Sequence, residues 1–150
     1  MMLQFLVGTL VSVINIGIHA LVTVVAVTVA RSAVPRHTKR PRLHLMSVMI
    51  TIAVVLKIAH MIEILMWAAT YHVVQAAADA DMLYFAFVNY TTLGYGDITP
   101  VREWRLLGPL TAMNGVLLFG WSAAILFEVL LKTLDHLGLT EKPGVDLPRT

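Results

Sequence analysis

Three long apolar segments limit what this chain of 150 residues can fold into. Residues 1–30 contain no Asp, Glu, Lys or Arg, residues 43–74 carry charge only at Lys57 and Glu63, and residues 106–131 carry only Glu128. A helix rises about 1.5 Å per residue, so roughly 20 apolar residues cross the hydrocarbon of a bilayer. Hydrocarbon offers no partner to backbone polar groups, so each segment should cross as a helix. The sequence therefore predicts an all-α membrane protein with three transmembrane helices.

The composition agrees with a membrane protein, since 58% of the residues are hydrophobic and only 13% are charged. A signal peptide is the competing interpretation of residues 1–30, but the segment lacks a positively charged start and its apolar run is too long. Cysteine is absent, which excludes disulfides and thiolate metal sites. The net charge of +2 gives no reason to expect a nucleic-acid partner.

Basic residues cluster between the first two apolar segments and set the expected orientation. This connection holds five of the eleven Lys and Arg residues: Arg31, Arg36, Lys39, Arg40 and Arg42. Short basic loops stay on the cytoplasmic side, so residues 31–42 are predicted to form a basic cytoplasmic loop in a multi-pass protein of the plasma or inner membrane. The N-terminus then lies outside, and residues 135–150 form a short cytoplasmic tail. Binding of the loop to anionic lipid is compatible with the same topology.

The region between the second and third segments predicts a short helix followed by an irregular loop. Asp79 or Asp81 can cap a helix, and residues 77–90 allow about three turns, too few to cross a bilayer. Helix cannot comfortably continue through the sequence GYG at 94–96. Unpaired backbone groups in hydrocarbon cost several kcal/mol each, so this loop must be wrapped in protein or line a water-filled path. A re-entrant helix and loop are therefore expected.

The loop sequence TTLGYGD, residues 91–97, suits a backbone that aims successive carbonyls in one direction. Such a backbone alternates between conformations of opposite hand, and glycine adopts the left-handed one without the penalty of about 1–2 kcal/mol that other residues meet. Thr92, Leu93, Gly94 and Tyr95 would then supply carbonyl oxygens, with the Thr92 hydroxyl as a further ligand. This ladder suits a hard cation stripped of its water. An ordinary turn is the alternative reading of GYG.

TTLGYGD resembles the selectivity filter of potassium channels, the standard example of ion coordination by carbonyls. The resemblance covers roughly residues 43–131. LYFAFVNYTTLGYGDITP resembles the pore helix, filter and outer turn, NGVLLFGWSAAILF the inner helix, and HMIEILMWA the outer helix of small prokaryotic members. Residues 1–42 have no counterpart in the simplest two-helix channels. Leu93 replaces the commoner valine, and Val88 stands where some members carry a glutamate that braces Asp97.

The resemblance implies a potassium-selective channel that conducts K⁺ passively, with residues 43–134 as the pore domain of a four-fold homotetramer in the lipid bilayer. K⁺ would be the permeant ion, with no cofactor. The implied filter residues, with K⁺ bound at the first four, are Thr92, Leu93, Gly94, Tyr95 and Gly96. The implied supports of the filter are Thr91, Asp97, Tyr84 and Phe85. The implied hinge, cavity and gate residues are Gly115, Val116, Phe119, Ala123 and Phe127.

Several alternatives remain open at this point. Phe119 and Phe127 could pack between helices, Gly115 could serve close packing instead of bending, and Asn89 begins a formal glycosylation sequon. A channel-like scaffold or regulatory subunit and a weakly selective cation channel are the alternative functions, with a membrane enzyme more distant. No catalytic constellation is evident, so the protein is not expected to be an enzyme. Regularly spaced arginines and room for a soluble ligand domain are also lacking, so gating should reside in the membrane portion.

Polar residues inside the first two spans predict a buried network. His60 and Glu63 follow Lys57 at three-residue steps, and Asn15 and His19 lie four apart on one face of the first span at similar depth. Charge in a bilayer is expensive unless paired, so we expect Asn15 and His19 to receive Lys57 or His60. Glu63 should reach the back of the re-entrant helix. Structural support is the favoured role, with proton sensing or a metal site at His19, His60 and Glu63 as alternatives.

Overall fold

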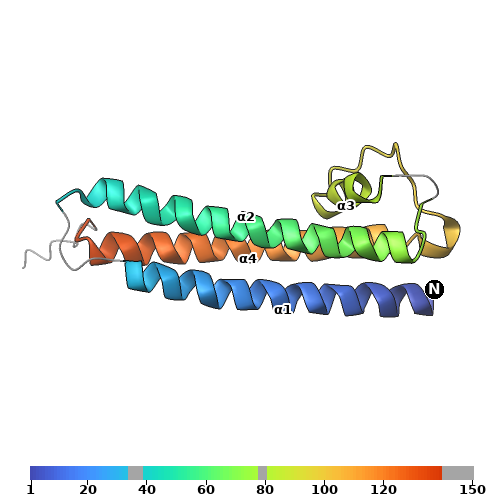
Figure 1. Ribbon diagram of the computed structural model, residues 1–150, viewed down its shortest axis with the longest axis horizontal. Coiled ribbons are helices and arrows are strands. Elements are labelled where there is room, and N and C mark those ends of the chain that lie inside the picture. The colour runs from blue at the N-terminus through green and yellow to red at the C-terminus, as the bar shows by residue number, and fades with distance from the viewer. Residues whose placement is uncertain (34–38, 78–80, 140–150) are drawn as a thin grey trace, which may run out of the picture.

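A computed structural model describes residues 1–33, 39–77 and 81–139, and the regular secondary structure of these residues is helical, with no strand. Three long helices lie side by side, and a short helix sits beside one end of the bundle (Figure 1). The elements in chain order are α1 (Met2–Ala33), α2 (Pro41–Val73), α3 (Met82–Tyr90), the 3₁₀ helix η1 (Arg102–Trp104) and α4 (Leu107–His136).

The three long helices match the predicted membrane spans. The segments Met2–Ala30, Pro41–Val73 and Arg102–His136 are each long and apolar enough to cross a bilayer. The prediction of an all-α membrane protein with three spans and a short helix before the third is therefore confirmed.

The C-terminal end of α4 differs from its predicted position. Residues 135 and 136, assigned to the tail from sequence, continue the helix, which ends at His136, two residues before Gly138. Gly138 has a φ of 64°, its N–H donates to the carbonyl of Asp135 at 3.0 Å, and the N–H of Leu139 donates to that of Leu134 at 2.9 Å. This pair of bonds is a Schellman motif, in which a left-handed residue satisfies the last helical carbonyls. The position of Gly138 therefore determines where α4 ends, and the end of the apolar run does not.

Asp81 is the N-cap of α3. This helix begins at Met82, whereas the sequence predicted a helix over residues 77–90. The Asp81 side chain accepts hydrogen bonds at 3.0 Å from the N–H groups of both Leu83 and Tyr84. These two donors belong to the first turn and have no partner within the helix. The other candidate cap, Asp79, lies outside the described residues.

An Asp81→Ala variant should lose about 1 kcal/mol of stability, because two backbone donors of α3 lose their acceptor. Thermal unfolding in detergent, compared with the wild type, measures this loss. An Asp81→Asn variant retains a capping oxygen and should stay within a few tenths of a kcal/mol of the wild type. Equal losses in both variants would contradict the assignment of the cap.

α1 packs against both α2 and α4. The Gln4 side-chain oxygen accepts a hydrogen bond at 2.9 Å from the N–H of Leu106, just before α4. Gly8 allows close approach, since a Cβ atom there would lie 2.4 Å from a methyl carbon of Leu110. Small and polar residues of α1 thus fit α4 as well as α2.

The core consists of two apolar clusters separated along the bundle by polar side chains. One cluster lies at the α3 end and includes Trp67, Tyr71 and Phe85. The other lies at the opposite end and includes Ile52 and Ile125. Between them are buried polar residues of α1, α2 and α4, namely Asn15, His19, Glu63, Asn114 and Ser122. This polar layer sits near the middle of the three long helices.

Candidate functional site

The loop 91–97 begins as the cap of α3. The N–H of Thr92 donates to the carbonyl of Asn89 at 3.0 Å, and the N–H of Leu93 donates to that of Val88 at 2.9 Å. With Thr92 at a φ of 59°, these bonds form a Schellman motif. The left-handed residue is usually glycine, and a β-branched residue there costs about 1–2 kcal/mol. Such strain is typical of functional sites.

Left-handed conformations recur at every second residue of the loop. Thr92, Gly94 and Gly96 have φ values of 59°, 59° and 75°, whereas neither Leu93 nor Tyr95 has a positive φ. A Cβ atom at Gly94 would have only one neighbour within 4 Å, at 3.9 Å. Space therefore does not require glycine there, but the backbone conformation does. The alternation is the one that a ladder of carbonyls needs.

The loop is uncovered on its own chain. All residues from 91 to 97 are exposed, and the side chains of Leu93 and Tyr95 are 53% and 68% exposed. Irregular backbone at membrane depth is tolerated only where protein buries it or where it lines a water-filled cavity. The chain by itself supplies no such cover, so the loop requires either a partner or an aqueous path.

Two of the predicted supports of the loop lie on α3 and differ in their surroundings. The Tyr84 hydroxyl donates to Oδ2 of Asp97 at 2.6 Å, and this hydrogen bond raises the pKa of the Tyr84 phenol. Oδ1 of Asp97 accepts from the N–H of Ile98 at 3.1 Å. Phe85 is instead buried, with its ring centroid 4.8 Å from that of Tyr71 on α2. The first contact ties α3 to the end of the loop, and the second fixes α3 on the bundle.

One face of α4 leaves four apolar residues exposed: Val116, Phe119, Ala123 and Phe127. Their three- and four-residue spacing places them on one side of the helix. Phe127 is 62% exposed and is not packed between helices of its own chain. Phe119 is 39% exposed, while its ring also lies 4.6 Å from that of His60. The residues predicted from the resemblance to line a cavity thus share one uncovered face.

Gly115 is buried beside this exposed face of α4 and serves close packing. A Cβ atom there would lie 2.0 Å from the carbonyl oxygen of Tyr90, at the end of α3. The helix runs without interruption from Leu107 to His136. Of the two readings left open for this glycine, the structure supports close approach between α3 and α4.

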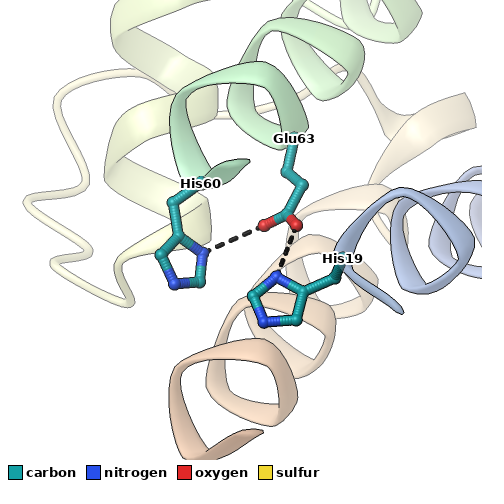
Figure 2. Close-up of side chains that lie close together, drawn as sticks. All are labelled: His19, His60 and Glu63. Atoms are coloured by element: carbon teal, nitrogen blue, oxygen red, sulfur yellow. Dashed lines mark hydrogen bonds and ion pairs between the residues drawn. The ribbon is translucent and has the colours of Figure 1, made fainter. Parts of the chain in front are cut away.

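Glu63 is the centre of the polar layer. Its carboxylate lies between two histidines, with Oε1 at 2.8 Å from Nδ1 of His19 and Oε2 at 3.0 Å from Nδ1 of His60 (Figure 2). The Tyr90 hydroxyl also donates to Oε2. Glu63 and His19 are fully buried. One carboxylate therefore links α1, α2 and the last residue of α3.

Four residues that the sequence analysis missed complete the layer. Besides Tyr90, these are Ser122 and Asn114 of α4 and Trp67 of α2. Asn114 accepts at 3.1 Å from Nδ2 of Asn15 and at 3.0 Å from Nε1 of Trp67. Asn114 and Ser122 stand eight residues apart in an apolar span, which places them on one helical face. This spacing is the signal from which the two residues could have been predicted to join the polar layer.

Lys57 does not join the polar layer, contrary to prediction. Its side chain is exposed, and Asn15 donates instead to Asn114 and, at 3.4 Å, to the backbone carbonyl of Glu63. The ion pairs of His19 and His60 are both with Glu63. The prediction placed Lys57 at the correct depth of α2 but on the wrong side.

A Glu63→Gln variant should lose about 2 kcal/mol of stability, because an amide nitrogen replaces one of two buried acceptors. Unfolding in detergent measures the loss. Glu128→Gln is the matched control, since Glu128 pairs with Lys132 while 58% exposed. An exposed pair contributes less than about 1 kcal/mol. Equal effects of the two changes would show that the buried carboxylate does not organise the layer.

The fold and the loop define a multi-pass helical membrane protein. Between its last two spans lie a short helix and a loop in which every second residue is left-handed. A family model described as "Ion channel" matches residues 43–132, more than half of the chain. The chain belongs to this ion channel family. No match was found among curated proteins or among solved structures.

Proposed function

We propose that the protein is a potassium-selective channel that conducts K⁺ passively across the cell membrane. The alternation of left-handed residues at Thr92, Gly94 and Gly96 carries this proposal. It suits a ladder of carbonyl oxygens from Thr92 to Tyr95 that replaces the hydration shell of a K⁺ ion. Rings of backbone carbonyls are the structural basis of filters in potassium channels.

The same loop supports a homotetramer. Each chain carries one copy of TTLGYGD, and one copy cannot surround an ion. The loop is exposed on the single chain, as is the apolar face of α4 with Val116 and Phe127. Four copies around an axis would cover the loop and turn this face toward a central cavity. α1 would lie outside this ring, where it packs on α2 and α4.

The orientation of α3 is favourable for a cation near the middle of the membrane. Its last residue, Tyr90, contacts Glu63 and His60, which lie in the middle of α2. The C-terminal end of a helix carries a partial negative charge and stabilises cations. The C-terminal end of α3 would therefore lie at the depth in the membrane where an ion leaves or enters the loop.

The proposed topology keeps the basic loop 31–42 and the tail 135–150 in the cytoplasm and the N-terminus outside. The pore domain spans residues 43–134. The positive charge of Arg40 and Arg42, next to the start of α2, supports this orientation.

Reconstitution into liposomes tests the proposal. With a K⁺ gradient, the reversal potential should follow the K⁺ gradient and be insensitive to a Na⁺ gradient of equal size. Equal fluxes of Na⁺ and K⁺ would instead indicate a weakly selective cation channel. A correctly assembled protein without flux would point to a channel-like scaffold or regulatory subunit.

A further inference from the structure

We propose that His19, His60 and Glu63 form a binding site for a divalent transition-metal ion such as Zn²⁺. One ligand atom from each residue lies within 4.8 Å of the other two. Two imidazoles and one carboxylate are a common ligand set for such ions. Figure 2 shows both rings turned toward the same carboxylate, one from α1 and one from α2. The ion would join these two helices in the middle of the bundle.

The ligand atoms lie close together but still have to be arranged around one ion. Nδ1 of His19 and Nδ1 of His60 lie 2.8 and 3.0 Å from the Glu63 oxygens. Ligands bound tetrahedrally at about 2.0 Å from a zinc ion are roughly 3.3 Å apart. The two histidines contact different oxygens of Glu63, and the three ligand atoms lie within 4.8 Å of one another. Rotation of the side chains must therefore bring both nitrogens and the carboxylate around one point.

Ser122 is placed as an outer partner for both imidazoles. Its hydroxyl oxygen lies 2.9 Å from Nε2 of His60 and 3.3 Å from Nε2 of His19. When Nδ1 of a neutral imidazole binds a metal, its Nε2 carries the proton and donates. One hydroxyl oxygen can accept from both rings. With both protons on Nδ1 instead, Ser122 would have to donate to two nitrogens with one hydrogen. The serine thus fits the metal-bound tautomers, as it also fits rings that carry a proton on both nitrogens.

Charge also favours a cation at this point. A carboxylate at mid-span is costly without a positive partner. The ion pairs that Glu63 makes within the described part of the chain are both with histidines, and Lys57 of the same helix is exposed. A divalent ion supplies the positive charge without protonation of either ring. The Tyr90 hydroxyl, which donates to Glu63, would hold the carboxylate in place.

The cluster has a candidate route of access. His60 keeps 12% of its side chain exposed, while His19 and Glu63 are fully covered. Its ring lies against Phe119, which belongs to the uncovered face of α4. An ion arriving on that side meets His60 first. Three protein ligands leave a fourth position to water.

Titration of the purified, chelator-treated protein with Co²⁺ tests the site without any measurement of flux. We expect visible absorption bands typical of tetrahedral Co²⁺, saturating at one ion per chain and abolished by Zn²⁺ competition. The His19→Ala and His60→Ala variants should bind roughly a hundredfold more weakly, and Ser122→Ala about tenfold more weakly. His72→Ala is the matched control, since His72 is exposed near the end of α2. It should bind as the wild type does.

The wild type decides the question even if a ligand variant fails to fold. Absence of the bands in folded wild-type protein would overturn the proposal. So would unchanged affinity in a folded His19→Ala, His60→Ala or Ser122→Ala variant, or equal weakening in His72→Ala. Zn²⁺ should also raise the melting temperature of the wild type, because an ion that binds only the folded state stabilises it. Neither readout depends on whether the protein conducts K⁺.

Discussion

A Gly115→Ala chain is expected to lose about 3 kcal/mol or more of folding stability, the upper range for overpacking a core. The added Cβ atom would lie 2.0 Å from the Tyr90 carbonyl oxygen and 3.0 Å from its carbonyl carbon. Both are backbone atoms, so no change of side-chain rotamer can relieve the collision. α3 must move away from α4, and the loop that follows Tyr90 must move with it.

Gly120→Ala is the control for this change. Gly120 lies in the same helix, and a Cβ atom there has no neighbour within 4 Å on its chain. Alanine is favoured over glycine within a helix by about 1 kcal/mol, so this variant should match or exceed the wild type in stability. Unfolding in detergent compares the three proteins. Similar melting temperatures for Gly115→Ala and the wild type would refute the close contact.

Substitution of Gly94 by alanine should abolish most K⁺ flux while leaving the helices folded. Gly94 has a φ of 59°, and a residue with a Cβ atom pays about 1–2 kcal/mol to remain left-handed. This penalty recurs in each subunit of the proposed tetramer, so flux should fall roughly a hundredfold or more. Potassium uptake by liposomes measures the fall, and circular dichroism shows whether the helices persist.

Gly138→Ala separates backbone strain in general from strain in the loop. Gly138 has a nearly equal φ of 64°, with no neighbour within 4 Å of a Cβ position, but it caps α4. Its replacement should cost similar stability per chain and leave K⁺ flux per assembled protein unchanged. Equal loss of flux in both variants would show that the loop has no special part in conduction.

The depth of residues in the bundle could be predicted from sequence, whereas their direction around each helix could not. Lys57, His60 and Glu63 are correctly placed near the middle of α2. Glu63 lies about 120° around the helix from Lys57, because six residues make one and two-thirds turns. Which of these faces turns inward depends on packing with α1 and α4. A single sequence contains no measure of that packing.

The loop was more predictable because its chemistry is local. Glycine at 94 and 96 indicated left-handed backbone, and the structure has it at both positions. The left-handed threonine at 92 was not foreseen as a helix cap. Its conformation follows from bonds to the carbonyls of Asn89 and Val88, and propensity would not place a β-branched residue there. The short helix therefore imposes a conformation that the residue itself disfavours.

Thr92 belongs both to the last turn of α3 and to the loop that follows, so the conformations of these two segments depend on each other. The residue closes the final turn of α3 and also begins the run of oxygens proposed to meet the ion. Fraying of that turn would release the first oxygen, and an ion held there would in turn suppress fraying. In the proposed channel, occupancy by the permeant ion would therefore stabilise the last turn of α3, and the loss of that turn would weaken ion binding.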